Sequence, residues 1–185
     1  MSQANKVILG IDPGTQILGY GLLRVDGKSM TYITMGVIDL RKLPDHFAKL
    51  SEIFKEVSLL ISKYSPDEMA IEAPFFGKNV QSMLKLGRAQ GAAIAAALNN
   101  NIPICEYAPR KIKLSITGKG AASKEQVASM ISKILNIDEI PVKLDATDGL
   151  AVALCHSYSS NSVLSSVKSS KSWESFIKNN PDRVK

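Results

Sequence analysis

The stretch Val7-Ile8-Leu9-Gly10-Ile11-Asp12-Pro13-Gly14-Thr15 decides the fold of this chain. Its apolar run is typical of a strand buried on both faces, and Pro13-Gly14 ends that strand in a turn. Asp12 therefore stands at the mouth of a buried strand, where a carboxylate is costly unless something neutralises it. Residues 19–25 and 31–38 have the pattern of two further strands, joined by the turn signal Asp26-Gly27. The N-terminal part is thus expected to form an antiparallel meander.

After the meander, the spacing of apolar residues changes to steps of three and four. This spacing predicts an amphipathic helix over residues 47–64, which Asp45 is placed to cap. Helices and strands then alternate, which favours parallel pairing of the later strands with the first. Ser123 and Gln126 form a capping box at the start of one of these helices. The remaining elements are expected as strands at 68–72 and 102–107, helices at 79–99, 109–117, 123–135 and 145–157, and a loop at 137–143. The sequence predicts an α/β fold, a five-stranded mixed sheet flanked by helices.

The length of 185 residues and the composition indicate one domain. We expect this domain to cover residues 1–158 and to be followed by a serine- and lysine-rich, mobile tail at 159–185. The chain carries 23 Lys and Arg against 17 Asp and Glu, a formal net charge of +6. Such a charge suits a protein that binds nucleic acid or another polyanion, but it is equally compatible with ordinary solubility.

The cysteine and histidine content excludes several classes of site. Cys105 and Cys155 lie in apolar stretches without a CxxC pattern, so they are expected to be buried free thiols in a reducing compartment. With only two histidines, a His-rich zinc site is not expected. No signal peptide and no membrane-spanning run are recognised, which predicts a cytoplasmic protein.

Four acidic residues are the candidates for chemistry: Asp12, Glu72, Asp145 and Asp148. Each has a structural explanation of its own, because Asp12 precedes a turn, Glu72 ends a strand, and Asp145 and Asp148 suit the first turn of a helix. Their joint occurrence on three elements instead predicts one cation site of hard oxygen ligands. Mg²⁺, with Mn²⁺ as its substitute, is the expected metal, and two ions would serve an in-line displacement at phosphorus.

The order and spacing of five motifs resemble those of the RuvC family of bacterial Holliday junction resolvases, from about Val7 to His156. The motifs are Gly10-Ile11-Asp12-Pro13-Gly14-Thr15, Ile71-Glu72-Ala73-Pro74-Phe75, Lys78-Asn79, Leu86-Gly87-Arg88-Ala89-Gln90-Gly91 and Asp145-Ala146-Thr147-Asp148-Gly149-Leu150-Ala151. The resemblance implies a ribonuclease H-like fold and fills all four acidic positions of the family's catalytic site. It also implies a homodimer that nicks two opposed strands of four-way junction DNA and leaves 5′-phosphate and 3′-hydroxyl ends. The branch-migration proteins RuvA and RuvB are the implied partners, and a sequence preference at the cut site is expected.

Further residues are candidates for DNA binding. Phe75 matches the family's aromatic residue that stacks on a base near the junction, and Lys78 and Asn79 follow it in the same loop. A second, basic group is expected to contact phosphates, with Lys113 and Lys124 at basic positions of the family; it comprises Arg110, Lys111, Lys113, Lys119 and Lys124. A solvated helix face would explain these charges as well.

One helix has an unusually smooth side, formed by Leu84, Gly87, Gly91 and Ala95. This side is a candidate dimer surface, although packing against the sheet within one chain would use the same residues.

Three other functions remain open from the sequence. One is another ribonuclease H-like nuclease that acts on RNA–DNA hybrids or structured RNA. A second is an actin-like or sugar-kinase ATPase, which the short chain and the lack of a second glycine-rich phosphate loop disfavour. The third is a non-catalytic junction-binding module, which metal-dependent cleavage would exclude.

Overall fold

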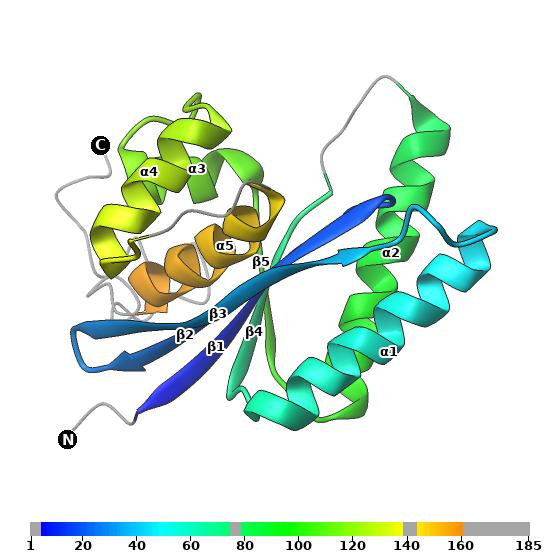
Figure 1. The fold of residues 1–185 in the computed structure, drawn as a ribbon, viewed down its shortest axis with the longest axis horizontal. Coiled ribbons are helices and arrows are strands. Elements are labelled where there is room, and N and C mark those ends of the chain that lie inside the picture. Colours follow the sequence, from blue (N-terminus) through cyan, green and yellow to red (C-terminus); the bar gives the residue numbers. More distant parts are fainter. Residues whose placement is uncertain (1–4, 75–78, 139–143, 161–185) are drawn as a thin grey trace, which may run out of the picture.

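A mixed sheet of five strands forms the centre of the molecule (Figure 1). The computed structural model describes residues 5–74, 79–138 and 144–160. The strands are β1 (Lys6–Asp12), β2 (Ile17–Asp26), β3 (Ser29–Asp39), β4 (Glu68–Glu72) and β5 (Ile104–Tyr107). They lie in the order β3-β2-β1-β4-β5, with β1, β2 and β3 antiparallel and β4 and β5 parallel to β1. The predicted meander and the parallel strands are both confirmed.

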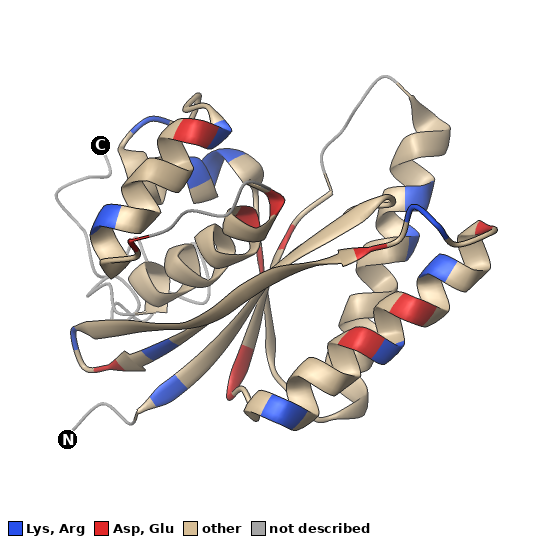
Figure 2. Ribbon diagram, viewed as in Figure 1, with Lys and Arg blue, Asp and Glu red and all other residues tan. Residues whose placement is uncertain are grey.

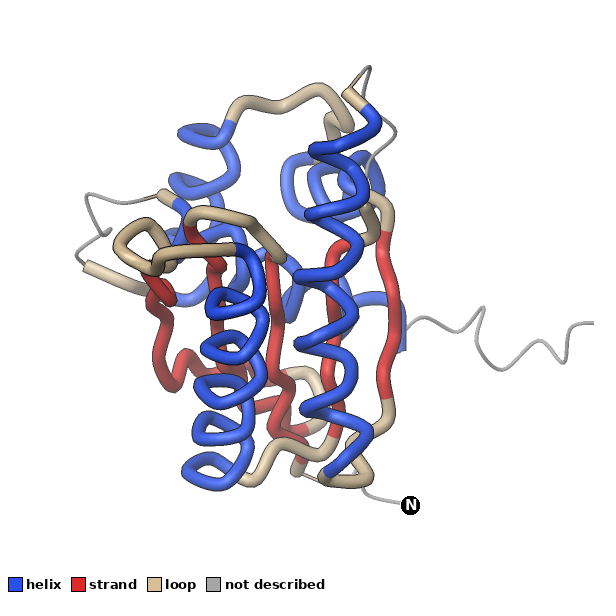
Figure 3. The backbone as a smooth tube through the Cα atoms, turned by 90° about the vertical axis from the view of Figure 1, so that its right-hand side faces the viewer, coloured by secondary structure: helices blue, strands red, loops and turns tan. Residues whose placement is uncertain are grey.

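Helices cover both faces of this sheet. They are α1 (His46–Tyr64), α2 (Val80–Asn99), α3 (Pro109–Thr117), α4 (Lys124–Leu135) and α5 (Asp145–Ser160). Helices α1 and α2 lie side by side over one face, which Figure 3 shows from their side. Helix α5 lies on the opposite face, and α3 and α4 pack against α5. Each face therefore has its own apolar core.

The alternation of side chains along β1 explains where the first acidic residue points. Leu9 and Ile11 belong to the core beneath α1 and α2, whereas Ile8 belongs to the core beneath α5. Successive residues of a strand face opposite sides, so Asp12 shares the α5 side with Ile8 and Gly10. In β4, Met69 and Ile71 face α1 and α2, and Ala70 faces α5, which places Glu72 on the α5 side as well.

Local signals in the sequence predicted the ends of several helices correctly. The Asp45 side chain accepts a hydrogen bond from the Ala48 amide at the start of α1. The capping box of Ser123 and Gln126 is present at the start of α4, and Pro109 is the first residue of α3.

Two predictions need correction, and two others can be compared with the structure only in small part. Cys155 is buried, but Cys105 is exposed, because β5 is an edge strand of the sheet. Helix α5 continues to Ser160, three residues beyond its expected end at residue 157. The expected loop at 137–143 and tail at 159–185 fall mostly outside the described residues.

Within the part of the chain that the structure describes, no helix has the length and apolar character needed to cross a membrane.

Candidate active site

Two of the four predicted acidic residues meet at the carboxyl ends of β1 and β4. The parallel register pairs Ile11 with Ile71, so the next residue on each strand is Asp12 and Glu72. Neighbouring strands lie about 4.8 Å apart, and both side chains face α5. The sheet thus presents two adjacent carboxylates toward the same helix.

Glycines allow α5 to approach the sheet closely enough to add the other two acids. A Cβ atom on Gly10 would lie 2.1 Å from the Gly149 carbonyl oxygen, and one on Gly19 would lie 2.0 Å from the Asp145 carbonyl oxygen. On the helix itself, a Cβ on Gly149 would lie 2.4 Å from Cα of Tyr20. Real side chains do not fit in such gaps, so the backbones of β1, β2 and α5 touch directly. This contact brings the first turn of α5, with Asp145 and Asp148, to the ends of the strands.

A pocket of about 260 Å³ opens where these elements meet. Its charged lining consists of Asp12, Glu72, Asp148, Lys113 and Lys124, and its apolar lining consists of Pro109, Ile112, Val127 and Ala151. Figure 2 shows the surrounding arrangement, with basic segments on α3 and α4 next to the acidic start of α5. The pocket combines a partly buried acidic floor with basic side chains, which suits a phosphate together with a cation.

Lys124 connects the acidic helix to α4. Its Nζ atom lies 2.5 Å from Oδ2 of Asp148 and 3.2 Å from Oδ1 of Asp145. Burial alone would lower the pKa of Lys124, but the hydrogen bonds to Asp148 and Asp145 outweigh it and raise that pKa. A single ammonium group therefore holds both carboxylates of the first turn.

The remaining negative charge is poorly compensated. Burial, followed by repulsion from Glu72 and Asp148, raises the pKa of Asp12 to about 8. Burial and the charge of Asp148 raise the pKa of Glu72 to about 7. Burial also raises the pKa of Asp148, although its hydrogen bond to Lys124 opposes this. The site has more carboxylates than one lysine can neutralise, which favours either protonation or a bound cation.

The donor set fits a hard divalent cation, since Mg²⁺ and Mn²⁺ prefer carboxylate oxygens. Asp145 and Asp148 are nevertheless paired with Lys124, and no group of three or more His, Cys, Asp or Glu within the described residues is arranged to hold an ion. Asp145 does not line the pocket with Asp12, Glu72 and Asp148. An ion would thus compete with the Lys124 ammonium group for the carboxylates of α5.

The other predicted DNA-binding residues lie in different places. Lys113 lines the acidic pocket, whereas Lys119 is exposed beyond the end of α3 and Arg110 is exposed beside Gly120. The Asn79 side chain accepts a hydrogen bond from the Ser82 amide, so it caps α2. Phe75 and Lys78 lie outside the described residues.

Sequence reasoning missed two kinds of residue that shape this site. The buried Gln90 of α2 donates to the Glu72 carbonyl oxygen and to the Glu106 carboxylate, and so fixes the end of β4. The sequence did carry a signal for Gln90, because it is a polar residue among the alanines of α2. The contact of Gly10 and Gly19 with α5 was missed as well, because it joins segments far apart in the sequence.

Comparison with known proteins agrees with this geometry. A sequence model described as crossover junction endodeoxyribonuclease RuvC matches residues 8–156. The crossover junction endodeoxyribonuclease RuvC of Cytophaga hutchinsonii is 61% identical over 98% of this chain and 89% of its own length. That of Bacteroides fragilis is 58% identical over 97% of this chain and 96% of its own.

A solved structure has the same fold. Thermus thermophilus RuvC in complex with a Holliday junction substrate aligns with a TM-score of 0.78 and 30% identity, over 84% of this chain and 95% of that chain. The expected ribonuclease H-like fold and the family resemblance are confirmed. The chain belongs to the RuvC family of crossover junction endodeoxyribonucleases.

Proposed function

We propose that this protein is a structure-selective DNA endonuclease that resolves Holliday junctions during recombination and repair. The single observation that supports this most strongly is the pocket in which Asp12, Glu72 and Asp148 meet Lys113 and Lys124. A family relationship alone would leave open whether the site is intact. Here the acidic positions of the family pattern are filled, and three of them line one pocket with basic residues.

The proposed chemistry is hydrolysis of a phosphodiester that leaves 5′-phosphate and 3′-hydroxyl ends. Asp12, Glu72, Asp145 and Asp148 would hold Mg²⁺, with Mn²⁺ able to replace it and two ions per site expected. When bound, such a pair of ions supplies a more acidic water molecule and stabilises charge on the leaving oxygen. Among the chain's own groups, Lys113 and Lys124 orient the phosphate, and the apolar wall of Ile112 and Val127 limits access of bulk water.

Lys124 has two roles in this proposal. Without substrate it neutralises Asp145 and Asp148, and with metal and DNA present its ammonium group would turn to a phosphate oxygen. This exchange keeps the acidic site stable before the cation arrives. Lys119 and Arg110, which lie outside the pocket, would contact the backbone of a junction arm.

We further infer that the active form is a homodimer, since paired nicks on opposed strands need two sites. Its candidate surface is the α2 stripe, formed by Val80, Leu84, Gly87, Gly91, Ala95 and Leu98. Val80, Leu84 and Leu98 are 63%, 52% and 61% exposed, and a Cβ on Gly87 or Gly91 would meet no atom within 4 Å. The alternative, that this side packs on the sheet, does not fit these exposures. RuvA and RuvB remain the proposed partners, and the cytoplasm is the proposed site of action.

A synthetic four-way junction with one labelled strand per arm tests the function. Incubation with Mg²⁺ should give paired, symmetric nicks whose ends a DNA ligase can seal, while a plain duplex of the same sequence stays intact. Binding to the junction without cutting in either Mg²⁺ or Mn²⁺ would point to a non-catalytic binding module. Cutting of an RNA–DNA hybrid in preference to the junction would point to another nuclease of the same fold.

A further inference from the structure

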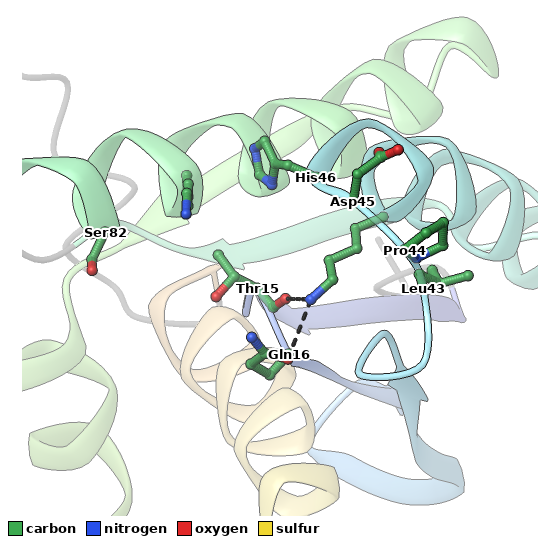
Figure 4. Close-up of a pocket in the computed structure, with 9 residues that line it drawn as sticks. Thr15, Gln16, Leu43, Pro44, Asp45, His46 and Ser82 are labelled. Carbon is green, nitrogen blue, oxygen red and sulfur yellow. Dashed lines mark hydrogen bonds between the residues drawn. The ribbon is translucent and has the colours of Figure 1, made fainter.

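A second polar pocket of about 320 Å³ lies on the α1 and α2 side of the sheet. The turn after β1 contributes Thr15 and Gln16, and the segment that leads into α1 contributes Leu43, Pro44 and Asp45. The first two turns of α1 and α2 contribute the rest. The full lining consists of Thr15, Gln16, Leu43, Pro44, Asp45, His46, Lys49, Ser82 and Lys85. Figure 4 shows His46 on one side of this pocket and Thr15 with Gln16 on the other.

The topology places this pocket at the same edge of the sheet as the acidic site. Helix α1 leads into β4, and α2 connects β4 to β5; both strands are parallel to β1. Helices with such connections begin at the carboxyl edge of the strands, where Asp12 and Glu72 lie. Thr15 follows Asp12 by three residues, so the chain can separate them by at most about 11 Å. A DNA strand that reaches Asp12 therefore has further phosphates near this pocket.

The pocket contains two lysines whose charges are not used in ion pairs. Lys49 donates to the Thr15 carbonyl oxygen at 3.1 Å and to Oε1 of Gln16 at 3.2 Å, both of which are neutral acceptors. An ammonium group has three donors, so one remains for a ligand. Neither Lys49 nor Lys85 forms a salt bridge with another residue that the structure describes.

His46 supplies an independent observation. Its Nε2 atom is buried and has no hydrogen-bond partner among the described residues. A buried polar atom without a partner is costly, so it calls for an explanation, and a group that binds there is one. Among the described residues that line the pocket, Asp45 is the one acidic side chain, and it already accepts a hydrogen bond from the Ala48 amide. Asp45 and Asn79 cap α1 and α2, so the side chains rather than free helix ends would recognise a ligand.

We propose that this pocket, the α1–α2 phosphate site, binds a backbone phosphate of the junction DNA next to the cleaved position. The phosphate would accept from Lys49 and Lys85, with the hydroxyl groups of Thr15 and Ser82 as further donors. Nε2 of His46 is buried in this structure and would reach the phosphate once its ring turns toward the pocket. Such a contact carries no sequence information, but it fixes the register of the strand over the acidic site. The inference rests on the proposed function, since it takes junction DNA as the ligand.

The salt dependence of junction binding tests this site. Each phosphate contact contributes about 0.9 to the slope of log K against log salt concentration. Lys85→Gln should therefore lower the slope by about 0.9 and weaken binding about eightfold at roughly 0.1 M salt. Lys85 is exposed and is not part of the α2 stripe, so the variant should fold and dimerise like the wild type. The matched control is Lys63→Gln, which removes the same charge at the far end of α1 and should leave the slope unchanged.

The outcomes separate this proposal from the proposed function. Binding is measured in a chelator, and cleavage of the same junction by the wild type is measured with Mg²⁺. Wild-type cleavage together with equal slopes for Lys85→Gln and Lys63→Gln would refute the α1–α2 phosphate site and leave the resolvase function standing. Absence of wild-type cleavage and binding would refute the function itself.

A second measurement identifies the source of the phosphate. The chain has two histidines, so ¹⁵N labelling of histidine gives signals from His46 and from His156 only. Addition of a short duplex that represents one junction arm should move the Nε2 signal of His46 and leave that of His156 in place. An equal displacement with inorganic phosphate at the same phosphate concentration would indicate a site for free phosphate and would overturn the proposal. An unmoved His46 signal in the presence of DNA would overturn it as well.

Discussion

Asp12 is the residue at which the proposed chemistry can be tested most directly. Its carboxylate is held at the end of β1 by the sheet, so replacement by Asn keeps the shape and removes the charge of a proposed metal ligand. We expect Asp12→Asn to reduce junction cleavage by on the order of a thousandfold or more. Junction affinity in a chelator should stay the same or rise slightly, because the basic residues remain. Gel-shift and cleavage assays on one junction measure both quantities, and cleavage at the wild-type rate would contradict the assigned role.

The same variant has a distinct effect on stability. Since the pKa of Asp12 is raised to about 8, the folded, metal-free protein holds a proton that the unfolded chain releases near pH 4. The stability of the wild type therefore falls as pH rises from about 4 to about 8, and that of Asp12→Asn falls less. Thermal melts in a chelator should show the variant to be the more stable protein at pH 8, by about 1–3 kcal/mol, with a smaller difference at pH 5. Equal melting temperatures of the wild type and Asp12→Asn at both pH values would show that the ionised Asp12 carboxylate does not destabilise the fold.

Lys124 should control the pH dependence of cleavage. Its charge lowers the pKa of both Asp12 and Glu72, although burial dominates in each case. Without that charge, both carboxylates hold their protons to higher pH, and a cation binds less well at neutral pH. Lys124→Gln should therefore move the acidic limb of the pH–rate profile to higher pH, and the rate on that limb should fall about tenfold for every pH unit by which it moves. Lys119→Gln is the control: it should weaken junction binding without moving that limb, because Lys119 lies outside the acidic pocket.

At the scale of elements, the direct contact of α5 with the sheet holds the site together. Gly149→Ala would place a methyl group about where the Tyr20 backbone lies, so α5 must move outward. Overpacking of this kind costs about 1–3 kcal/mol, and the displacement would carry Asp145 and Asp148 away from the strand ends. We expect a lower melting temperature and a loss of cleavage larger than the loss of junction binding. Gly87→Ala in α2 meets no atom within 4 Å and should stabilise the fold by up to about 1 kcal/mol.

A partly buried polar network ties α5 to the end of the sheet opposite the acidic site. The Glu68 carboxylate lies 2.6 Å from Nζ of Lys6 and 2.7 Å from Nε2 of His156, and Nδ1 of His156 lies 2.7 Å from the Tyr107 hydroxyl. Burial alone would raise the pKa of Glu68, but the hydrogen bonds from Lys6 and His156 together lower it. A lowered pKa stabilises the folded state above the unfolded value near 4.5, and this contribution is lost as pH falls below it.

Glu68→Gln should consequently be less stable than the wild type at pH 7, by about 1 kcal/mol after allowance for solvent around the lysine. The difference should shrink as pH falls below about 4.5 toward the lowered pKa of Glu68, because the folded wild type then takes up a proton as well. Chemical denaturation at pH 7 and pH 4 measures it. A difference that stays constant between these pH values would assign the effect to packing rather than to the charge of Glu68.

For the whole molecule, the sequence predicted what depends on short stretches of chain. The five strands, the Asp45 cap and the capping box at Ser123 follow from neighbouring residues, and the motif order pointed to the family. The features that were missed depend on tertiary contacts. Gly10 and Gly149 meet from opposite ends of the folded chain, and Gln90 reaches Glu72 only once α2 lies beside β4. The burial of Cys105 was wrongly expected because its apolar neighbours do not show that β5 is an edge strand.

The proposed dimer can be tested without touching either active site, because its candidate surface is the α2 stripe. Leu84 is 52% exposed on that stripe, and Leu59 is 53% exposed on the neighbouring helix α1. Exposed apolar patches of this kind mark protein interfaces, and a buried charge there without a partner is strongly unfavourable. Leu84→Glu should therefore shift the protein toward monomer in sedimentation velocity, whereas Leu59→Glu, with the same substitution at equal exposure, should remain dimeric. On a junction, the Leu84→Glu protein should release singly nicked molecules in place of paired nicks, because its two cuts are no longer coupled. If both variants remain dimeric, the dimer interface must lie on another surface. If both are monomeric, the added charge disrupts the dimer without regard to its position.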